Sequence, residues 1–290
     1  MLNLYEAVRS NPSFNKLEIG DLLFAEYTCP VDEARMGQWS HSDYLVHVLS
    51  GRKIWHTSDG AWPLQAGDTV FFRKGAAVIE QFFDVDFCLL LFFVPDSLVR
   101  STVREFAGRW TGSASTDPSL KVAARVNNDV ALTAFFDSMR TYFAGREKPS
   151  EPLLRLKVKE LVLSILTGHS NQALAAYFQS LAHRDAPSVE EIMEANFRFH
   201  LSLDEYAALC HRSLSSFKRD FRTHFGEPPG RWLLRRRLDY AAVLLQTTTA
   251  RITEIVLESG FEDVAHFSRV FKQRFRVSPS AYRHALPAAT

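Results

Sequence analysis

The sequence predicts an α+β protein of two domains, a β-barrel with attached helices followed by an all-α domain. Three observations support this class. Up to about Pro95, short runs of β-branched and aromatic residues alternate with turn signals. Longer segments with helical patterns follow, and an aromatic-and-proline frame then occurs twice near the C-terminus.

The predicted N-terminal strands cover residues 44–49, 52–57, 69–72 and 87–94. Turn pairs such as Ser50-Gly51, Asp59-Gly60 and Lys74-Gly75 separate these runs. Short strands at such regular intervals are typical of an all-β barrel or a jelly roll.

Four helices are predicted after the strands, over residues 97–106, 129–143, 152–166 and 172–182. The third of these helices, over residues 152–166, has two apolar faces, and both must be buried. One face can pack on the barrel, while the other packs either on a second subunit or inside the same chain. Residues 183–187 are a predicted linker, because an acidic helix with a Ser188 and Glu191 cap begins immediately after them. We therefore expect domains at residues 1–183 and 188–290.

The aromatic-and-proline frame repeats after fifty positions. Its members are Phe217, Phe221, Phe225, Pro229 and Trp232, then Phe267, Phe271, Phe275, Pro279 and Tyr282. Phenylalanines four residues apart share one face of a helix. Each copy therefore predicts a helix with a buried aromatic stripe, a turn and a helix that begins at proline.

A shorter helix and a tight turn precede each aromatic stripe. Ser202 and Glu205 have the spacing of a capping box for a helix over residues 203–210, and Ser213 can cap the next helix. In the second copy, Gly260 is suited to end the first helix and Asp263 to begin the second. Two helix-turn-helix motifs are thus predicted, joined by a helix over residues 229–245 about 25 Å long.

Charge is distributed unevenly between the two parts of the chain. Residues 210–290 contain fourteen Lys and Arg against seven Asp and Glu, a net charge of +7, while the preceding residues carry −6. A basic region is expected of a module that neutralises phosphates. The run Arg235-Arg236-Arg237 could alternatively be only a solvated helix face.

Residues from about 188 to 285 resemble the DNA-binding domain of the AraC family of transcription regulators. The stretches RRRLDYAAVLL, ITEIVLESGFEDVAHFSRVFKQRF and VSPSAYR carry the resemblance. Two departures, Cys210-His211 in the first turn and Val256 in place of a more usual Ala, put base preference in doubt but not the fold.

The resemblance implies contacts to promoter DNA from the second helix of each motif. Base contacts would come from Ser215, Lys218 and Arg219 in the first copy, and from Ala265, Ser268 and Arg269 in the second. The expected phosphate contacts are Arg222, Arg235, Arg236, Lys272 and Arg274. RNA polymerase would then be a further partner.

The segment SGRKIWHTSDGAWPLQAGDTVFFRKGA resembles the cupin-like sensor half of the same family. A catalytic cupin holds a metal, but Arg73 and Val78 occupy the positions of its proline and histidine, and His41, His47 and His56 form no close pair. We therefore expect no metal, no cofactor and no catalytic residues. Trp39, Tyr44, Trp55, Trp62 and Phe72 are candidates for an effector pocket, although inward-facing aromatic residues could simply fill the barrel.

A second, shorter resemblance concerns what controls the activity of the protein. FFRKGAAV and LLRLKVKELVLSIL are similar to regulators of type III secretion within the AraC family, which implies control by a protein partner without a small effector. The three cysteines, Cys29, Cys88 and Cys210, have neither metal-ligand spacing nor an even count for disulfides, so we expect reduced thiols.

The sequence therefore predicts a sequence-specific, cytoplasmic transcription activator, controlled by a small effector or a protein partner. No stretch is long and apolar enough to suggest a membrane span. Two alternatives remain open at this point. One is a cupin-fold enzyme with a DNA-binding tail, and the other is a protein-binding adaptor for which DNA contact is secondary.

Overall fold

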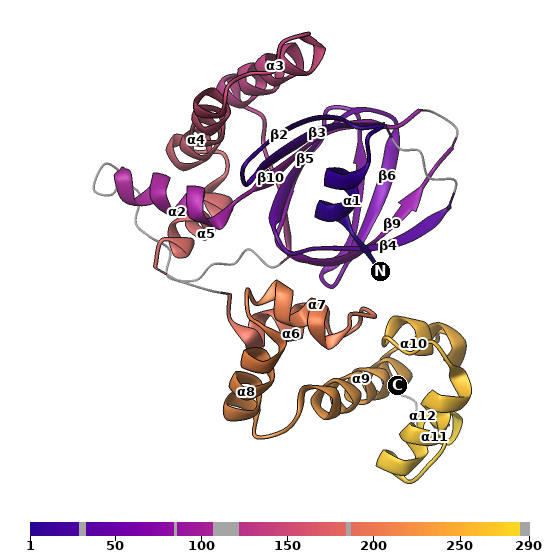
Figure 1. Cartoon of the computed structure of the whole chain (residues 1–290). Helices are drawn as coiled ribbons and strands as arrows, with labels where there is room; N and C mark the ends of the chain where they lie inside the picture. Colours follow the sequence, from indigo (N-terminus) through magenta and orange to yellow (C-terminus); the bar gives the residue numbers. More distant parts are fainter. Residues whose placement is uncertain (29–32, 84–85, 107–121, 184–186, 285–290) are drawn as a thin grey trace. The chain divides into compact units, whose positions relative to one another are not determined.

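The computed structural model describes residues 1–28, 33–83, 86–106, 122–183 and 187–284 of the chain (Figure 1). The chain divides into two compact units, Met1–Pro187 and Ser188–Thr290. Each unit has a hydrophobic core of its own.

Two β-sheets form the framework of the first unit and enclose a common core. One sheet has the order β1-β4-β9-β6-β7 and the other β11-β8-β5-β10-β3-β2. The strands are β1 (Leu2–Asn3), β2 (Asn15–Ile19), β3 (Leu22–Thr28), β4 (Arg35–Ser40), β5 (Asp43–Ser50), β6 (Arg52–Thr57), β7 (Gly60–Gln65), β8 (Thr69–Phe72), β9 (Gly75–Gln81), β10 (Cys88–Val94) and β11 (Ala123–Arg125). Strand β1 runs parallel to β4, while the other pairs are antiparallel.

The four predicted strands correspond to β5, β6, β8 and β10, and are confirmed to within a residue at most ends. Several of the remaining strands carry weak sequence signals. Strand β7 contains Pro63, which a strand tolerates at a sheet edge, and β7 is the terminal strand of its sheet. Edge strands of this kind escape a prediction that relies on apolar runs.

The unbroken apolar sequence of β10 follows from burial on both of its faces. Leu89, Leu91 and Phe93 point into the core between the two sheets. Leu90 and Phe92 point to the other side, where they pack against helices. Strand side chains alternate between faces, so a strand covered on both sides needs apolar residues at every position.

Helices cover the outer face of the six-stranded sheet, as Figure 1 shows for α2 to α5. They are α2 (Asp96–Glu105), α3 (Val130–Ala144), α4 (Glu151–Thr167) and α5 (Gln172–Leu181). These helices match the four predicted ones, and no end is displaced by more than one residue. A further helix, α1 (Leu4–Ser10), was not predicted; it places Leu4 and Val8 in the core between the sheets.

A buried polar cluster joins the sheets to these helices. The ammonium group of Lys74 lies 2.5 Å from the carboxylate of Asp96 at the start of α2. Asp43 on β5 accepts hydrogen bonds from the Lys74 amide at 2.8 Å and from the Tyr177 hydroxyl of α5 at 2.7 Å. Burial raises the pKa of Asp43, while Lys74 opposes that rise. The cluster therefore fixes α2 and α5 to the barrel through groups that would be costly to leave unpaired.

The second unit is entirely helical. Its helices are α6 (Val189–Asn196), α7 (Leu203–Leu209), α8 (Leu214–Phe225), α9 (Pro229–Thr247), α10 (Ile252–Glu258), α11 (Val264–Phe275) and α12 (Pro279–His284). The predicted helices and caps are confirmed: Ser202 and Glu205 form a capping box, and Ser188, Ser213 and Asp263 accept the expected backbone hydrogen bonds.

Helix α9 connects the two halves of this unit and also holds the loop that follows α6. The guanidinium of Arg237 donates to the carbonyl oxygens of Phe197 and Phe199 at 2.6 and 2.8 Å. Burial lowers the pKa of Arg237, and the nearby Tyr206 opposes that effect. One member of the arginine run is thus a structural residue, which the sequence pattern did not distinguish.

Gly226 provides a test of the helix ends in this unit. It ends α8 with a left-handed backbone, φ +70°, where side chains other than glycine are strained. We expect Gly226→Ala to lower the free energy of unfolding by about 1 kcal/mol. A Cβ atom at this position would meet no atom within 4 Å, so the cost would come from the backbone alone.

Gly230→Ala in α9 is the matched control, because its added Cβ atom also meets open space and its backbone is helical. This substitution should leave stability unchanged or raise it, since alanine favours helices. Urea denaturation of both variants measures the difference. Equal stabilities would contradict the assigned role of Gly226.

Candidate nucleic-acid interface

Each of the two predicted recognition helices buries one aromatic face. In α8, Phe217 and Phe221 are fully buried, and the rings of Phe221 and Phe225 pack on Trp232 at 6.0 and 5.4 Å. In α11 the same arrangement is made by Phe267, Phe271, Phe275 and Tyr282, with corresponding distances of 5.4 and 5.1 Å. The aromatic residues therefore belong to the core, as predicted, and the opposite face of each helix is left exposed.

The two turns before these helices are similar but differ in length by one residue. Cys210 and Ser259 end the first helices, and His211 and Gly260 follow with positive φ angles of 55° and 85°. Three residues separate Cys210 from helix α8, whereas four separate Ser259 from α11. The left-handed backbone of His211 costs only a modest amount of free energy, so the turn forms although this position is not glycine.

Burial also affects the cysteine in the first turn. Cys210 is fully buried, and burial raises the pKa of its thiol to about 11. Its sulfur is therefore protonated at neutral pH and poorly reactive. Cys88 is half-buried, and Cys29 lies outside the described residues.

The structure places the candidate base-contact residues on the outer faces of α8 and α11. Ser215, Lys218 and Arg219 are exposed on α8 and share one face by their three- and four-residue spacing. On α11, Ala265 and Arg269 are exposed and Ser268 is half-buried.

The five candidate phosphate contacts divide into two groups. Within the described residues, the side chains of Arg222 and Lys272 form no hydrogen bond or ion pair, and both are exposed in the last turn of their helices. The other three make ion pairs inside the unit: Arg235 with Glu227, Arg236 with Glu194 and Arg274 with Asp239, at 2.7, 2.9 and 2.5 Å. Those three would have to share or exchange partners to reach a phosphate.

Sequence reasoning did not identify a polar group beside the first candidate base-contact arginine. Asp220 lies 3.3 Å from the Nε atom of Arg219 and 3.2 Å from the Nε atom of Arg212 in the turn. Ser216 accepts a hydrogen bond from Arg219 at 3.3 Å. A comparison of the two copies would have indicated this group, because Val270 stands at the position of Asp220 in the second copy.

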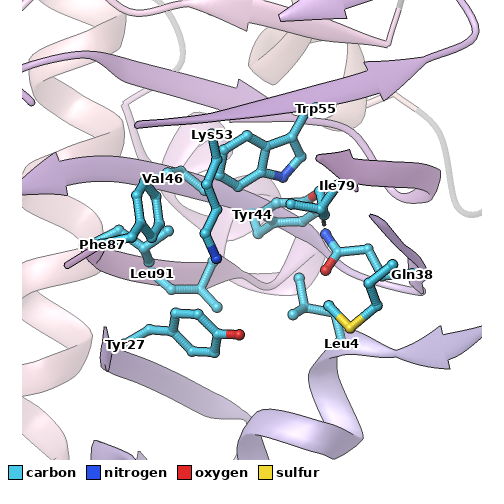
Figure 2. Close-up of a pocket in the computed structure, with 12 residues that line it drawn as sticks. Leu4, Tyr27, Gln38, Tyr44, Val46, Lys53, Trp55, Ile79, Phe87 and Leu91 are labelled. Carbon is cyan, nitrogen blue, oxygen red and sulfur yellow. Dashed lines mark hydrogen bonds between the residues drawn. The ribbon is translucent and has the colours of Figure 1, made fainter. Parts of the chain in front are cut away.

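A small cavity lies between the sheets of the first unit, and Figure 2 shows its lining. Of the five candidate effector residues, Tyr44 and Trp55 line the cavity. Phe72 is not part of the lining but stacks on both rings. Trp39 is buried on β4, and Trp62 is half-buried on β7. The structure thus brings only part of the predicted set together.

Lys53 and Trp55 are two of the residues that bring polar groups to the cavity lining. The Lys53 side chain is 4% exposed, donates to Gln81 at 2.7 Å and lies 4.4 Å from the centre of the Phe87 ring. The indole nitrogen of Trp55 has no hydrogen-bond partner within the described residues. The cavity volume is about 30 Å³, whereas sites for small molecules usually span about 300–1,000 Å³. In this conformation the cavity is too small for an effector of ordinary size.

The three barrel histidines that form no close pair in the sequence have separate environments. His47 stacks on Phe136 and contacts Thr69 at 2.8 Å, while His56 contacts Glu80 at 2.8 Å. His41 packs near Tyr5. Across the described residues there is no group of three potential metal ligands. Among all residues that the structure describes, no helix is long and apolar enough to cross a lipid bilayer.

Comparison with known proteins agrees with this architecture in both halves. Residues 43–177 match the ExsA N-terminal regulatory domain, and residues 206–285 match a helix-turn-helix domain. The virulence regulon transcriptional activator VirF of Yersinia enterocolitica is 24% identical over 86% of this chain and 91% of its own length. The HTH-type transcriptional regulator ExsA of Pseudomonas aeruginosa is 22% identical over 81% of this chain and 84% of its own.

Among solved structures, an apo form of ToxT from Vibrio cholerae aligns with 93% of this chain and 99% of its own, at 14% identity and a TM-score of 0.45. The sequence matches and the paired helix-turn-helix motifs define a DNA-binding transcription regulator. The chain belongs to the AraC family of such regulators.

Proposed function

We propose that this protein is a transcription activator that reads two successive major-groove segments of promoter DNA. The duplicated helix-turn-helix unit carries the proposal, because each copy buries an aromatic face and exposes a short polar and basic one. Arg219 and Arg269 are the principal base-reading candidates, since arginine can bond a guanine with two hydrogen bonds. Relatives named as transcriptional activators support activation over repression.

The other partners follow from this assignment. We infer that the protein acts on promoter DNA together with RNA polymerase, and that it does so in the cytoplasm. We infer no enzymatic role, because the family consists of transcription regulators. The adaptor alternative gains less support, since a protein-binding role does not account for two exposed basic helix faces.

We propose that a protein partner, rather than a small effector, controls the activity of this regulator. A cavity of about 30 Å³ would have to expand several-fold before it could enclose a typical small effector. The match of residues 43–177 to a regulatory domain is consistent with a barrel that transmits a signal. A small effector remains the alternative if the cavity opens.

Recovery of genomic fragments tests the central proposal. Purified protein is mixed with sheared DNA of its source organism at physiological salt, and the bound fragments are sequenced. We expect a few promoter fragments that share two short blocks about 34 Å apart, because two recognition helices read successive grooves. Uniform recovery would mean that a partner must first release the DNA-binding unit, or that the outer faces do not read bases.

Arg219→Ala and Arg269→Ala identify which block each helix reads. Each change should cost about 1–3 kcal/mol on the selected fragment and relax specificity at one block only. Equal weakening on selected and random DNA by both variants would contradict base reading.

A second prediction separates the two groups of candidate phosphate contacts. Removing one phosphate contact should reduce the slope of log affinity against log salt by about one unit. We expect this reduction for Arg222→Gln and Lys272→Gln, whose side chains have no partner to displace within the described residues. The reduction should be smaller for Arg235→Gln and Arg236→Gln, because their ion pairs with Glu227 and Glu194 compete with DNA.

Fluorescence anisotropy titrations at several salt concentrations measure these slopes. An unchanged slope in Arg222→Gln or Lys272→Gln would remove that residue from the phosphate contacts. A larger change in Arg235→Gln than in Arg222→Gln would contradict the competition by ion pairs.

We also propose that α4 mediates a homodimer. Its inner face is buried, with Leu154, Val158 and Leu161 in the core. On another side, Leu156 is 59% exposed and lines an open groove of about 760 Å³ together with Leu163. A second copy of α4 could cover these apolar side chains.

Sedimentation velocity tests this interface. We expect a dimer for the unmodified protein and a monomer for Leu156→Glu, because a carboxylate would be buried without a partner. Val243→Glu is the matched control, since Val243 is 51% exposed on a helix of the other unit. A monomeric unmodified protein, or dissociation caused equally by both variants, would contradict the proposal.

A further inference from the structure

The two recognition helices hold their equivalent arginines differently. Arg219 on α8 is 75% exposed, yet its guanidinium contacts Asp220 and Ser216, each at 3.3 Å. The side chain of Arg269, at the same position of α11, makes no hydrogen bond or ion pair with any residue that the structure describes. The first arginine therefore has polar partners on its own helix, whereas the second has none among the described residues.

Asp220 is the centre of the contacts that orient Arg219. One of its carboxylate oxygens accepts from Arg219, and the other lies 3.4 Å from the Ser216 hydroxyl and 3.2 Å from Arg212. Arg212 belongs to the turn between α7 and α8, so Asp220 joins the turn to the outer face of the recognition helix. Both carboxylate oxygens are used, and the group is partly shielded, with 35% of the side chain exposed.

The second motif lacks each part of this arrangement. Val270 replaces Asp220 and His266 replaces Ser216, fifty positions later. In its turn, Phe261 and Glu262 stand where the first copy has Arg212, and Glu262 contacts His200 instead. The difference is thus a change of the whole polar group rather than of one contact.

We propose that Asp220 is a positioning residue that gives the first recognition helix the greater base specificity of the two. This inference rests on the proposed function, because it assumes that Arg219 reads a base. A carboxylate beside the guanidinium restricts its rotamers and reduces the loss of side-chain freedom on binding. The same negative charge disfavours an alternative contact of Arg219 with a neighbouring phosphate. Arg269 lacks both constraints and is free to contact either bases or phosphates.

Asp220→Asn tests the proposal, because it removes the charge and keeps the shape. The first block is defined as the base positions at which Arg219→Ala loses discrimination. The measured quantity is the ratio of the affinity for the selected fragment to the affinity for the same fragment with the first block substituted. Asp220→Asn should reduce this ratio by about 2- to 10-fold, which is the effect expected from ordering one long side chain. Discrimination at the second block should be unchanged, and affinity for random DNA should rise.

Two comparisons exclude a general effect of charge or folding. Asp204→Asn removes the same charge from an exposed site in α7 and should leave discrimination at both blocks unchanged. In an Arg219→Ala background, Asp220→Asn should have no further effect at the first block, because a positioning residue acts through its partner. Ser216→Ala, which removes the other contact without altering charge, should cause a smaller loss at the same block.

The outcomes distinguish this inference from the proposed function. If Arg219→Ala reduces discrimination but Asp220→Asn does not, or does so equally at both blocks, Asp220 does not position Arg219. A loss from Asp220→Asn that persists in the Arg219→Ala background would also overturn the inference. If Arg219→Ala changes discrimination at no base position, the proposed base reading fails and the inference fails with it.

Discussion

The aromatic core of each helix-turn-helix motif is the constraint on which the DNA-binding unit depends. Phe221 and Phe271 are fully buried and are packed by the next aromatic residue of the same helix and by Trp232 or Tyr282. Because these rings fix one face of each helix toward the core, the residues on the opposite face are determined by spacing alone. The exposure of Lys218, Arg219 and Arg269 is therefore a consequence of packing.

Electrostatic interactions within the second unit decide which basic residues are available to a ligand. Its positive charge is not uniformly free, since Arg235, Arg236 and Arg274 are paired with acidic residues and Arg237 binds backbone carbonyls. Arg222 and Lys272 extend from the last turns of the two recognition helices. Net charge indicates a nucleic-acid partner, but local pairing decides how that charge is used.

Polar contacts in the first unit join its sheets to its helices. The polar cluster of Asp43, Lys74, Asp96 and Tyr177 connects the barrel to α2 and α5. Helix α5 ends at Leu181, shortly before Pro187, the last residue of the unit. The carbonyl oxygen of Ala182, the residue after α5, accepts hydrogen bonds from Arg104 of α2. The C-terminal end of α5 is thus hydrogen-bonded to α2.

The sequence by itself determined the features that depend on local spacing and on backbone chemistry. Phenylalanines four residues apart, Ser202 with Glu205, and Gly260 each identify their structure because helix periodicity, capping and positive φ act over a few residues. Only the tertiary structure decided the pairing of Arg235 and Arg236, the cavity lined by Tyr44 and Trp55 without Trp39, and the contact of Asp220 with Arg212 across the turn. These depend on which side chains converge from separate elements, and that convergence is set by packing of the whole unit, which no local pattern encodes.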